Sequence, residues 1–168
     1  MTNLKVPIRY VPYNLTKKDA RKQTNMLLRS RKLYKKGEYF TRKKIPSYKS
    51  KPSNHIQNAQ KIYKIDNIRP SKEVSRKTGC SISALRKIVN KGEGAYYSSG
   101  SRPNQTPQSW GYARLASALT SGKAAAVDFS IIEKGCDHRK PAYRMALQSR
   151  KKYKNGQSHT KRRKIHAR

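Results

Sequence analysis

The sequence predicts a mainly α-helical protein, with a small helical centre at about residues 53–154 and extended basic arms at the N-terminal and C-terminal ends. Two observations carry this prediction. Helix-start residues precede stretches with apolar residues at helical spacing, and glycines follow those stretches. The end regions instead combine prolines or basic runs with few apolar residues, so they are expected to be extended.

Positive charge dominates the composition. The chain has 168 residues, with 41 Lys and Arg against 8 Asp and Glu, and a formal net charge of +33. Leu, Ile, Val and Phe make up only 27 residues, which is typical of chains that fold poorly alone. We therefore expect an ordering partner: nucleic acid, an anionic membrane face or a large assembly. No apolar run is long enough for a transmembrane helix, and no signal peptide is expected at the start.

Residues 1–52 are expected to form an arm over 1–15, then a basic helix and linker over 16–52. Prolines within the arm predict an extended segment or at best an edge strand. Thr16 is expected to cap the helix and Gly37 to end it. Aromatic side chains among basic ones can stack on bases, but anchoring in pockets of another protein is favoured here. The protein-contact candidates of this region are Ile8, Tyr10, Tyr13, Tyr39, Phe40 and Tyr48.

Residues 53–92 are expected to form a helical hairpin region. Ser53 is expected to cap a short helix over 53–63. Ser71 and Ser81 are expected to cap two further short helices. Gly79 would end the first in left-handed geometry, and Gly92 would end the second. The pattern is similar to a helix-turn-helix, although an ordinary hairpin with a basic face is commoner. In a DNA-reading version, the second helix would present Ser83, Arg86, Lys87 and Asn90.

Residues 93–136 are expected to form a central loop–helix block. The glycine-rich stretch 92–106 predicts a loop held to its own helix by side-chain hydrogen bonds, with Arg102 as the candidate to bridge carbonyls or a carboxylate. Thr106 followed by Pro107 predicts a helix start. Asp128 is expected to cap a later short helix. The expected core residues are Trp110, Leu115 and Leu119, with Trp110 anchoring the only substantial core.

Residues 137–168 are expected to form a basic helix that begins at Pro141, followed by a basic tail. From residue 138 onward the chain has no acidic residue. The tail is therefore expected to make electrostatic contacts with an acidic neighbour. The candidates for binding an anionic partner are Arg86, Lys87, Lys161, Arg162, Arg163 and Lys164.

Patterns for catalysis and metal binding are missing from the sequence. The eight acids are not paired at useful spacing, and the four histidines lack metal-ligand spacing with the two cysteines. The glycines match no nucleotide-binding motif. We expect no enzyme activity, cofactor, metal or small-molecule substrate. Cys80 and Cys136 are expected to be reduced thiols of an intracellularly made protein, with a disulfide as the less favoured alternative.

The block GAYYSSGSRPNQTPQSWGYARLASALTSGKAAAVD resembles a domain of uncharacterised proteins in nucleocytoplasmic large DNA viruses of the phycodnavirus-like and mimivirus-like kind. The upstream blocks RYVPYNLTKKDARKQTNMLLRSRKLYKKGEYFTRKK and PSKEVSRKTGCSISALRKIV also resemble it, so the resemblance covers about Arg9 to Cys136. The family brings no established catalytic residues. The resemblance implies a viral protein and a component of the virus particle.

Resemblance and charge together give the expected function. We expect a minor capsid (cement) protein on the inner face of the capsid, made in the host cytoplasm or nucleus. Its partners would be the major capsid protein and other minor capsid proteins, with nucleic acid or the anionic inner membrane surface as further contacts. The alternative is a viral DNA-binding protein that condenses or packages the genome. A ribosomal-type RNA binder fits the charge but not the resemblance.

Overall fold

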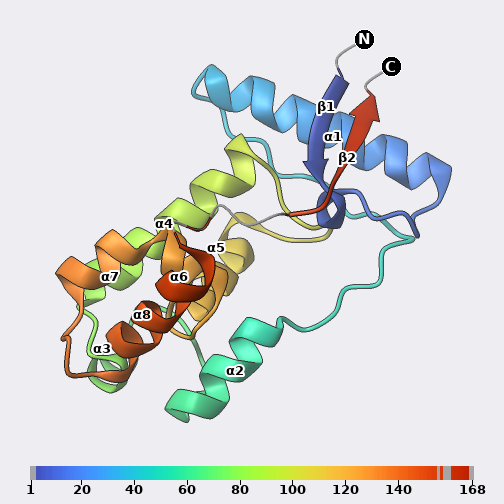
Figure 1. Ribbon diagram of the computed structural model, residues 1–168. Coiled ribbons are helices and arrows are strands. Elements are labelled where there is room, and N and C mark those ends of the chain that lie inside the picture. The colour runs from blue at the N-terminus through green and yellow to red at the C-terminus, as the bar shows by residue number, and fades with distance from the viewer. Residues whose placement is uncertain (1–2, 155, 157–159, 167–168) are drawn as a thin grey trace. The chain divides into compact units, whose positions relative to one another are not determined.

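The protein is mainly helical in its computed structural model, as the sequence predicts; the structure describes residues 3–154, 156 and 160–166 (Figure 1). Helices and strands occupy most of the described chain. The helices are α1 (Lys17–Lys35), α2 (Asn54–Tyr63), α3 (Lys72–Thr78), α4 (Ile82–Ser98), α5 (Pro107–Ala118), α6 (Lys123–Val127), α7 (Phe129–Gly135) and α8 (Pro141–Tyr153). The strands are β1 (Asn3–Pro7) and β2 (Arg162–His166), and a 3-10 turn covers Ile8–Tyr10.

The chain folds into two units, each made of segments that are distant in the sequence. Unit 1 comprises residues 1–51, 93–110 and 159–168, and unit 2 comprises residues 52–92 and 111–158. The division passes through α4 and α5, so both helices contribute residues to both units.

In unit 1 the two ends of the described chain pair with each other. β1 and β2 form an antiparallel ladder in which Leu4 lies opposite Ile165 and Val6 opposite Arg163, and Figure 1 shows the strands side by side. Pro7 ends β1, at the place where a residue without an N–H costs the ladder least. The sequence suggested ordering by a neighbouring molecule, whereas in these described residues the partner strand comes from the same chain.

The core of unit 1 lies between this ladder and α1. Its buried members are Val6, Tyr10, Val11, Leu27 and Ile165. Trp110 packs against them, with its ring centroid 6.2 Å from that of Tyr10 in an edge-to-face arrangement. Thr16 caps α1 as expected, because its hydroxyl accepts from the Asp19 N–H at 3.2 Å.

Unit 2 begins with three helices that share one buried cluster. Ser53, Ser71 and Ser81 cap α2, α3 and α4 as expected, since each serine hydroxyl accepts an N–H from the first turn that follows it. Gly79 ends α3 with φ of 83°, the left-handed conformation that the sequence predicts. The members that these helices bury together include Ala59, Tyr63, Val74, Leu85 and Ile88.

The second half of unit 2 completes that cluster. The segment from α5 to α8 adds Leu115, Leu119, Ala125, Phe129, Ile132, Ala142 and Ala146. Pro107 begins α5 and Pro141 begins α8, as the sequence predicts. The expectation of a single core around Trp110 is wrong: Leu115 and Leu119 belong to the unit 2 cluster, while Trp110 packs on the separate unit 1 cluster.

The expected end of α4 at Gly92 is wrong. The helix continues to Ser98, so the irregular loop is confined to residues 99–106. Gly92 serves packing instead, because a Cβ there would lie 2.6 Å from the Gly111 Cα of α5. Two glycines thus let α4 and α5 cross at close range, and neither acts as a helix stop.

Candidate nucleic-acid interface

The first half of α4 carries polar side chains on one face and apolar ones on the other. Spacing of three and four residues places the polar set on a single face. All four of its members are exposed: Ser83, Arg86, Lys87 and Asn90. The opposite face is buried through Ala84, Leu85, Ile88 and Val89. We call the exposed set the α4 face.

The turn between α3 and α4 is fixed to the end of α7 by covalent and backbone bonds. Cys80 and Cys136 form a disulfide, so the expectation of reduced thiols is wrong. The Ser81 N–H donates to the Gly135 carbonyl at 2.8 Å, and the Asp137 N–H donates to the Gly79 carbonyl at 2.8 Å. These two hydrogen bonds form an isolated antiparallel β-bridge. The β-bridge places Cys80 opposite Cys136, although 56 positions separate them in the sequence.

A hollow of about 350 Å³ adjoins the α4 face on the side of α7. Gly135 allows the approach, because a Cβ there would collide with the Cβ of Ala84. The lining side chains are mostly hydroxyl-bearing or basic: Ser81, Ser83, Ala84, Lys87, Ser130, Ile131, Lys134 and Gly135. The two lysines converge on this hollow from two helices, so an anionic group there would meet two ammonium groups and several hydroxyl donors.

The chemistry of the α4 face matches what base edges require. A guanidinium such as that of Arg86 can donate two hydrogen bonds to guanine, and an amide such as that of Asn90 can bond adenine at two points. Lys87 and Lys134 are suited to phosphate oxygens, which position a protein on DNA without reading sequence. The face therefore combines both kinds of contact on one exposed surface.

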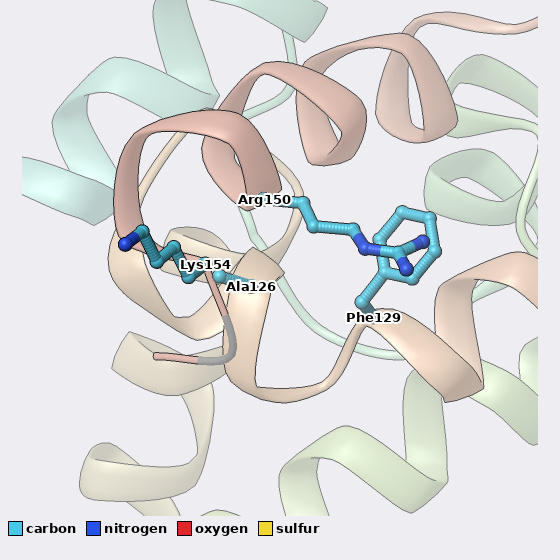
Figure 2. Close-up of a pocket in the computed structure, with 4 residues that line it drawn as sticks. All are labelled: Ala126, Phe129, Arg150 and Lys154. Carbon is cyan, nitrogen blue, oxygen red and sulfur yellow. The ribbon is translucent and has the colours of Figure 1, made fainter. Parts of the chain in front are cut away.

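A second hollow, of about 480 Å³, lies among α6, α7 and α8 of unit 2. Its lining includes Ala126, Phe129, Arg150 and Lys154, and Figure 2 shows the Arg150 side chain reaching across to the Phe129 ring. The Arg150 guanidinium carbon lies 4.5 Å from the centroid of that ring, a cation–π contact. Because the Arg150 guanidinium already contacts the Phe129 ring, it is less free to donate hydrogen bonds to a ligand than the side chains of the α4 face are.

Asp128 lies at the start of α7, and its buried carboxylate forms ion pairs. Asp128 occupies the N-cap position of α7, as predicted, but its carboxylate makes no capping bond there. It accepts two hydrogen bonds from Arg114, both at 2.8 Å, and pairs with the Lys91 ammonium at 3.2 Å. A fully buried carboxylate with two cations ties α4 and α5 to the start of α7 within unit 2.

Arg42 of unit 1 is a buried cation that sequence reasoning missed. Its guanidinium donates to the Ser30 hydroxyl, the Tyr96 carbonyl and the Ser101 hydroxyl at 2.8–3.0 Å, and it lies 3.8 Å from the centroid of the Tyr96 ring. Burial lowers the pKa of Arg42 below its ordinary value. Among 41 basic residues nothing in the sequence distinguishes this one, since its partners lie far along the chain.

The protein-contact candidates fall into engaged and exposed groups. Tyr10 is buried in the unit 1 core, and Phe40 lies under the Arg29 guanidinium at 4.5 Å. Ile8 and Tyr48 are half-buried. Arg102 is exposed, and its side chain bridges no carbonyl or carboxylate among the described residues. Tyr13 and Tyr39 are 68% and 70% exposed.

The anionic-partner candidates are exposed, with one exception. Arg86, Lys87, Lys161, Arg162 and Lys164 all reach solvent. Arg163 instead donates to the Val11 carbonyl at 2.7 Å, and its guanidinium carbon lies 4.3 Å from the Tyr13 ring centroid. Arg163 therefore helps to hold β2 against the segment that follows β1.

The described residues contain neither a metal-binding cluster nor a membrane-spanning helix. Among residues 3–154, 156 and 160–166, no group of three or more His, Cys, Asp or Glu residues is arranged to hold a metal ion. In the same residues, no helix has the length and apolar character needed to cross a membrane.

Comparison with known proteins identifies a family and nothing closer. No curated protein and no solved structure matches the chain significantly. A family model does match, over residues 7–137, and this range includes the whole α4 face and the α7 side of its hollow. Because the match covers well over half of the sequence, the chain belongs to the family of unknown function DUF5824.

Proposed function

We propose that the protein binds double-stranded DNA through the helix-turn-helix of unit 2, with the α4 face lying in the major groove. The observation that carries this proposal is the α4 face itself. Four exposed side chains suited to base edges and phosphates follow a tight turn, while the other side of the same helix is fixed in a buried cluster. The role is binding, not catalysis.

The charge of unit 2 supports the same proposal. Its segments carry 19 Lys and Arg against 5 Asp and Glu. Of these acids, Asp128 is buried between two cations and Asp137 is paired with Arg139. The other three, Asp66, Glu73 and Glu133, are exposed, so the excess of basic side chains leaves the unit strongly positive. Binding should therefore release counterions and weaken steeply as salt rises.

The resemblance to large DNA virus proteins gives the proposed setting. A viral protein of this charge that binds duplex DNA would condense or package the genome inside the virion. Within that setting, the exposed α4 face that follows the short α3–α4 turn supports this function over the cement role in the capsid.

The cement role remains a second candidate because unit 2 has exposed apolar side chains. Ile62 of α2 is 49% exposed, and Val127 and Leu147 are also exposed. Such side chains suit contacts with the major capsid protein or other minor capsid proteins. After gentle removal of DNA and membrane from particles, a cement protein stays with the shell, whereas a genome-binding protein leaves with the DNA.

Selection from a randomised duplex library tests the DNA-binding proposal. The wild-type chain is expected to enrich a short sequence motif. Arg86→Ala should relax the preference at one position and weaken binding to the selected duplex by about 1–3 kcal/mol. Arg144→Ala is the matched control, because it removes the same charge from an exposed position on α8 of the same unit.

Two results would contradict the proposal. Equal loss of affinity in Arg86→Ala and Arg144→Ala would mean that only overall charge matters. If the wild-type chain enriched no motif, the α4 face would not recognise a specific DNA sequence.

A further inference from the structure

Three tyrosines from separate stretches of the chain meet on the surface of unit 1. Tyr34 lies in the last turn of α1, Tyr39 in the segment after α1, and Tyr97 in the last turn of α4. The Tyr39 ring centroid lies 5.0 Å from that of Tyr97 and 6.2 Å from that of Tyr34. The rings of Tyr34 and Tyr97 are nearly parallel, with an interplanar angle of 5°. We call these three rings the tyrosine platform.

The platform is exposed in front and supported from behind. Tyr39 is 70% exposed, which is far more than an aromatic ring in a protein core. Tyr97 rests edge-to-face against the fully buried Tyr96, with ring centroids 5.2 Å apart. The Tyr96 hydroxyl accepts from the Arg42 N–H at 2.8 Å, and the Ser30 hydroxyl donates to the Tyr97 carbonyl at 3.0 Å. Tyr97 is thus held in place while Tyr39 faces solvent.

The surroundings of the platform are strongly basic. Unit 1 carries 22 Lys and Arg against 3 Asp and Glu. Lys32, Lys35 and Lys36 are exposed on or next to the last turn of α1, beside Tyr34, and Glu38 is the one acid in the segment that leads to Tyr39. Exposed aromatic faces within a positive field match the chemistry of single-stranded nucleic acid, which offers base faces for stacking and phosphates for the lysines.

We propose that the tyrosine platform binds unpaired nucleotide bases by stacking, with the neighbouring lysines holding the phosphates. A protein partner fits less well, because lysine is depleted in protein–protein interfaces. Duplex DNA fits less well too, because its bases already stack on each other and show only their edges. The platform lies in unit 1 and is independent of the α4 face, so this inference does not rest on the proposed function.

Binding measurements on the full chain test the platform. Fluorescence anisotropy would follow labelled oligo-dT, oligo-rU and a mixed-sequence duplex of equal length. Tyr39→Ala is expected to weaken single-strand binding by roughly ten-fold, within the range measured for one stacked base. Tyr39→Phe keeps the ring and should bind as the wild type does. The dT and rU arms show whether the platform prefers DNA or RNA.

Tyr13→Ala is the matched control. Tyr13 is 68% exposed and also belongs to unit 1, but it has no ring contact with the platform. Single-strand binding should survive this change, and duplex binding should survive Tyr39→Ala. The proposal is overturned if Tyr39→Ala binds both single strands like the wild type, if it weakens duplex binding equally, or if Tyr13→Ala weakens single-strand binding as much.

A second measurement needs no variant. An oligonucleotide that contains 5-iodouracil can be photo-crosslinked to the wild-type chain and the linked residue identified by mass spectrometry. Crosslinks at Tyr34, Tyr39 or Tyr97 are expected. Crosslinks confined to other residues would overturn the proposal, even if a substitution disturbed folding.

Discussion

At the scale of single residues, buried charges in this chain are satisfied in two different ways. The Arg42 guanidinium has hydroxyl and carbonyl acceptors and an aromatic ring, and no carboxylate among the described residues pairs with it. Asp128 has two cations. In a chain with 41 basic and 8 acidic residues, carboxylates are too few to neutralise every buried cation. Neutral hydroxyl and carbonyl oxygens therefore accept the hydrogen bonds of a buried guanidinium such as that of Arg42.

Asp128 gives the clearest prediction at this scale. Asp128→Ala should destabilise the protein by about 3 kcal/mol, because it leaves the partly buried Arg114 without its two hydrogen bonds. Thermal or denaturant unfolding followed by circular dichroism measures the loss. Asp137→Ala is the control: its partner Arg139 has a side chain that is 88% exposed, so the midpoint should change little. Equal effects of the two substitutions would contradict the account.

At the scale of elements, the helix starts could be predicted from the sequence, whereas the end of α4 could not. Thr16, Ser53, Ser71 and Ser81 all cap helices where predicted, because a capping hydroxyl acts on an N–H two or three residues away. The predicted helix end at Gly92 was wrong because the role of this glycine depends on Gly111, a residue on another helix. Features that depend on residues a few positions apart could be predicted from the sequence, whereas features that depend on a distant residue could not.

The candidate sites follow the same rule. The spacing of Ser83, Arg86, Lys87 and Asn90 is a property of one helix, so the sequence alone placed them together. The tyrosine platform draws on α1, the segment after it and α4, and the contact between Tyr39 and Tyr97 spans nearly sixty residues. The disulfide joins residues 56 positions apart, and the pairing of β1 with β2 joins the two ends of the described chain, so neither could be predicted from local sequence.

The bridge between the α3–α4 turn and α7 yields a prediction for one element. Cys136→Ser should lower stability by about 2–4 kcal/mol, since the disulfide closes a long loop and restricts the unfolded chain. The wild-type melting temperature should fall when reductant is added, and that of Cys136→Ser should not. A wild-type protein indifferent to reductant would show that the thiols are free in solution.

At the scale of the whole molecule, charge repulsion and two separate clusters of buried residues set the stability. Both units are strongly basic, with excess positive charge in each. Like charges spread over a folded surface repel each other and favour expanded states. Each cluster must outweigh this repulsion within its own unit, because the buried residues divide into two groups.

Salt should therefore stabilise the free protein. Raising sodium chloride from about 0.05 to 0.5 M shortens the Debye length to a few ångströms and screens the repulsion. We expect the melting temperature to rise across this range, while binding to duplex DNA weakens over the same range. A melting temperature that falls or stays constant would show that repulsion is not a main destabilising force.

The pairing of β1 with β2 has a consequence for the nascent chain. All of unit 2 is encoded between these two strands, so it leaves the ribosome after β1 and before β2. During synthesis β1 therefore has no partner strand until β2 is made. An unpaired strand edge can associate with other chains. All segments of unit 2 are synthesised before the last segment of unit 1 is. Translation speed through the unit 2 segments thus sets how long β1 stays open to misassembly.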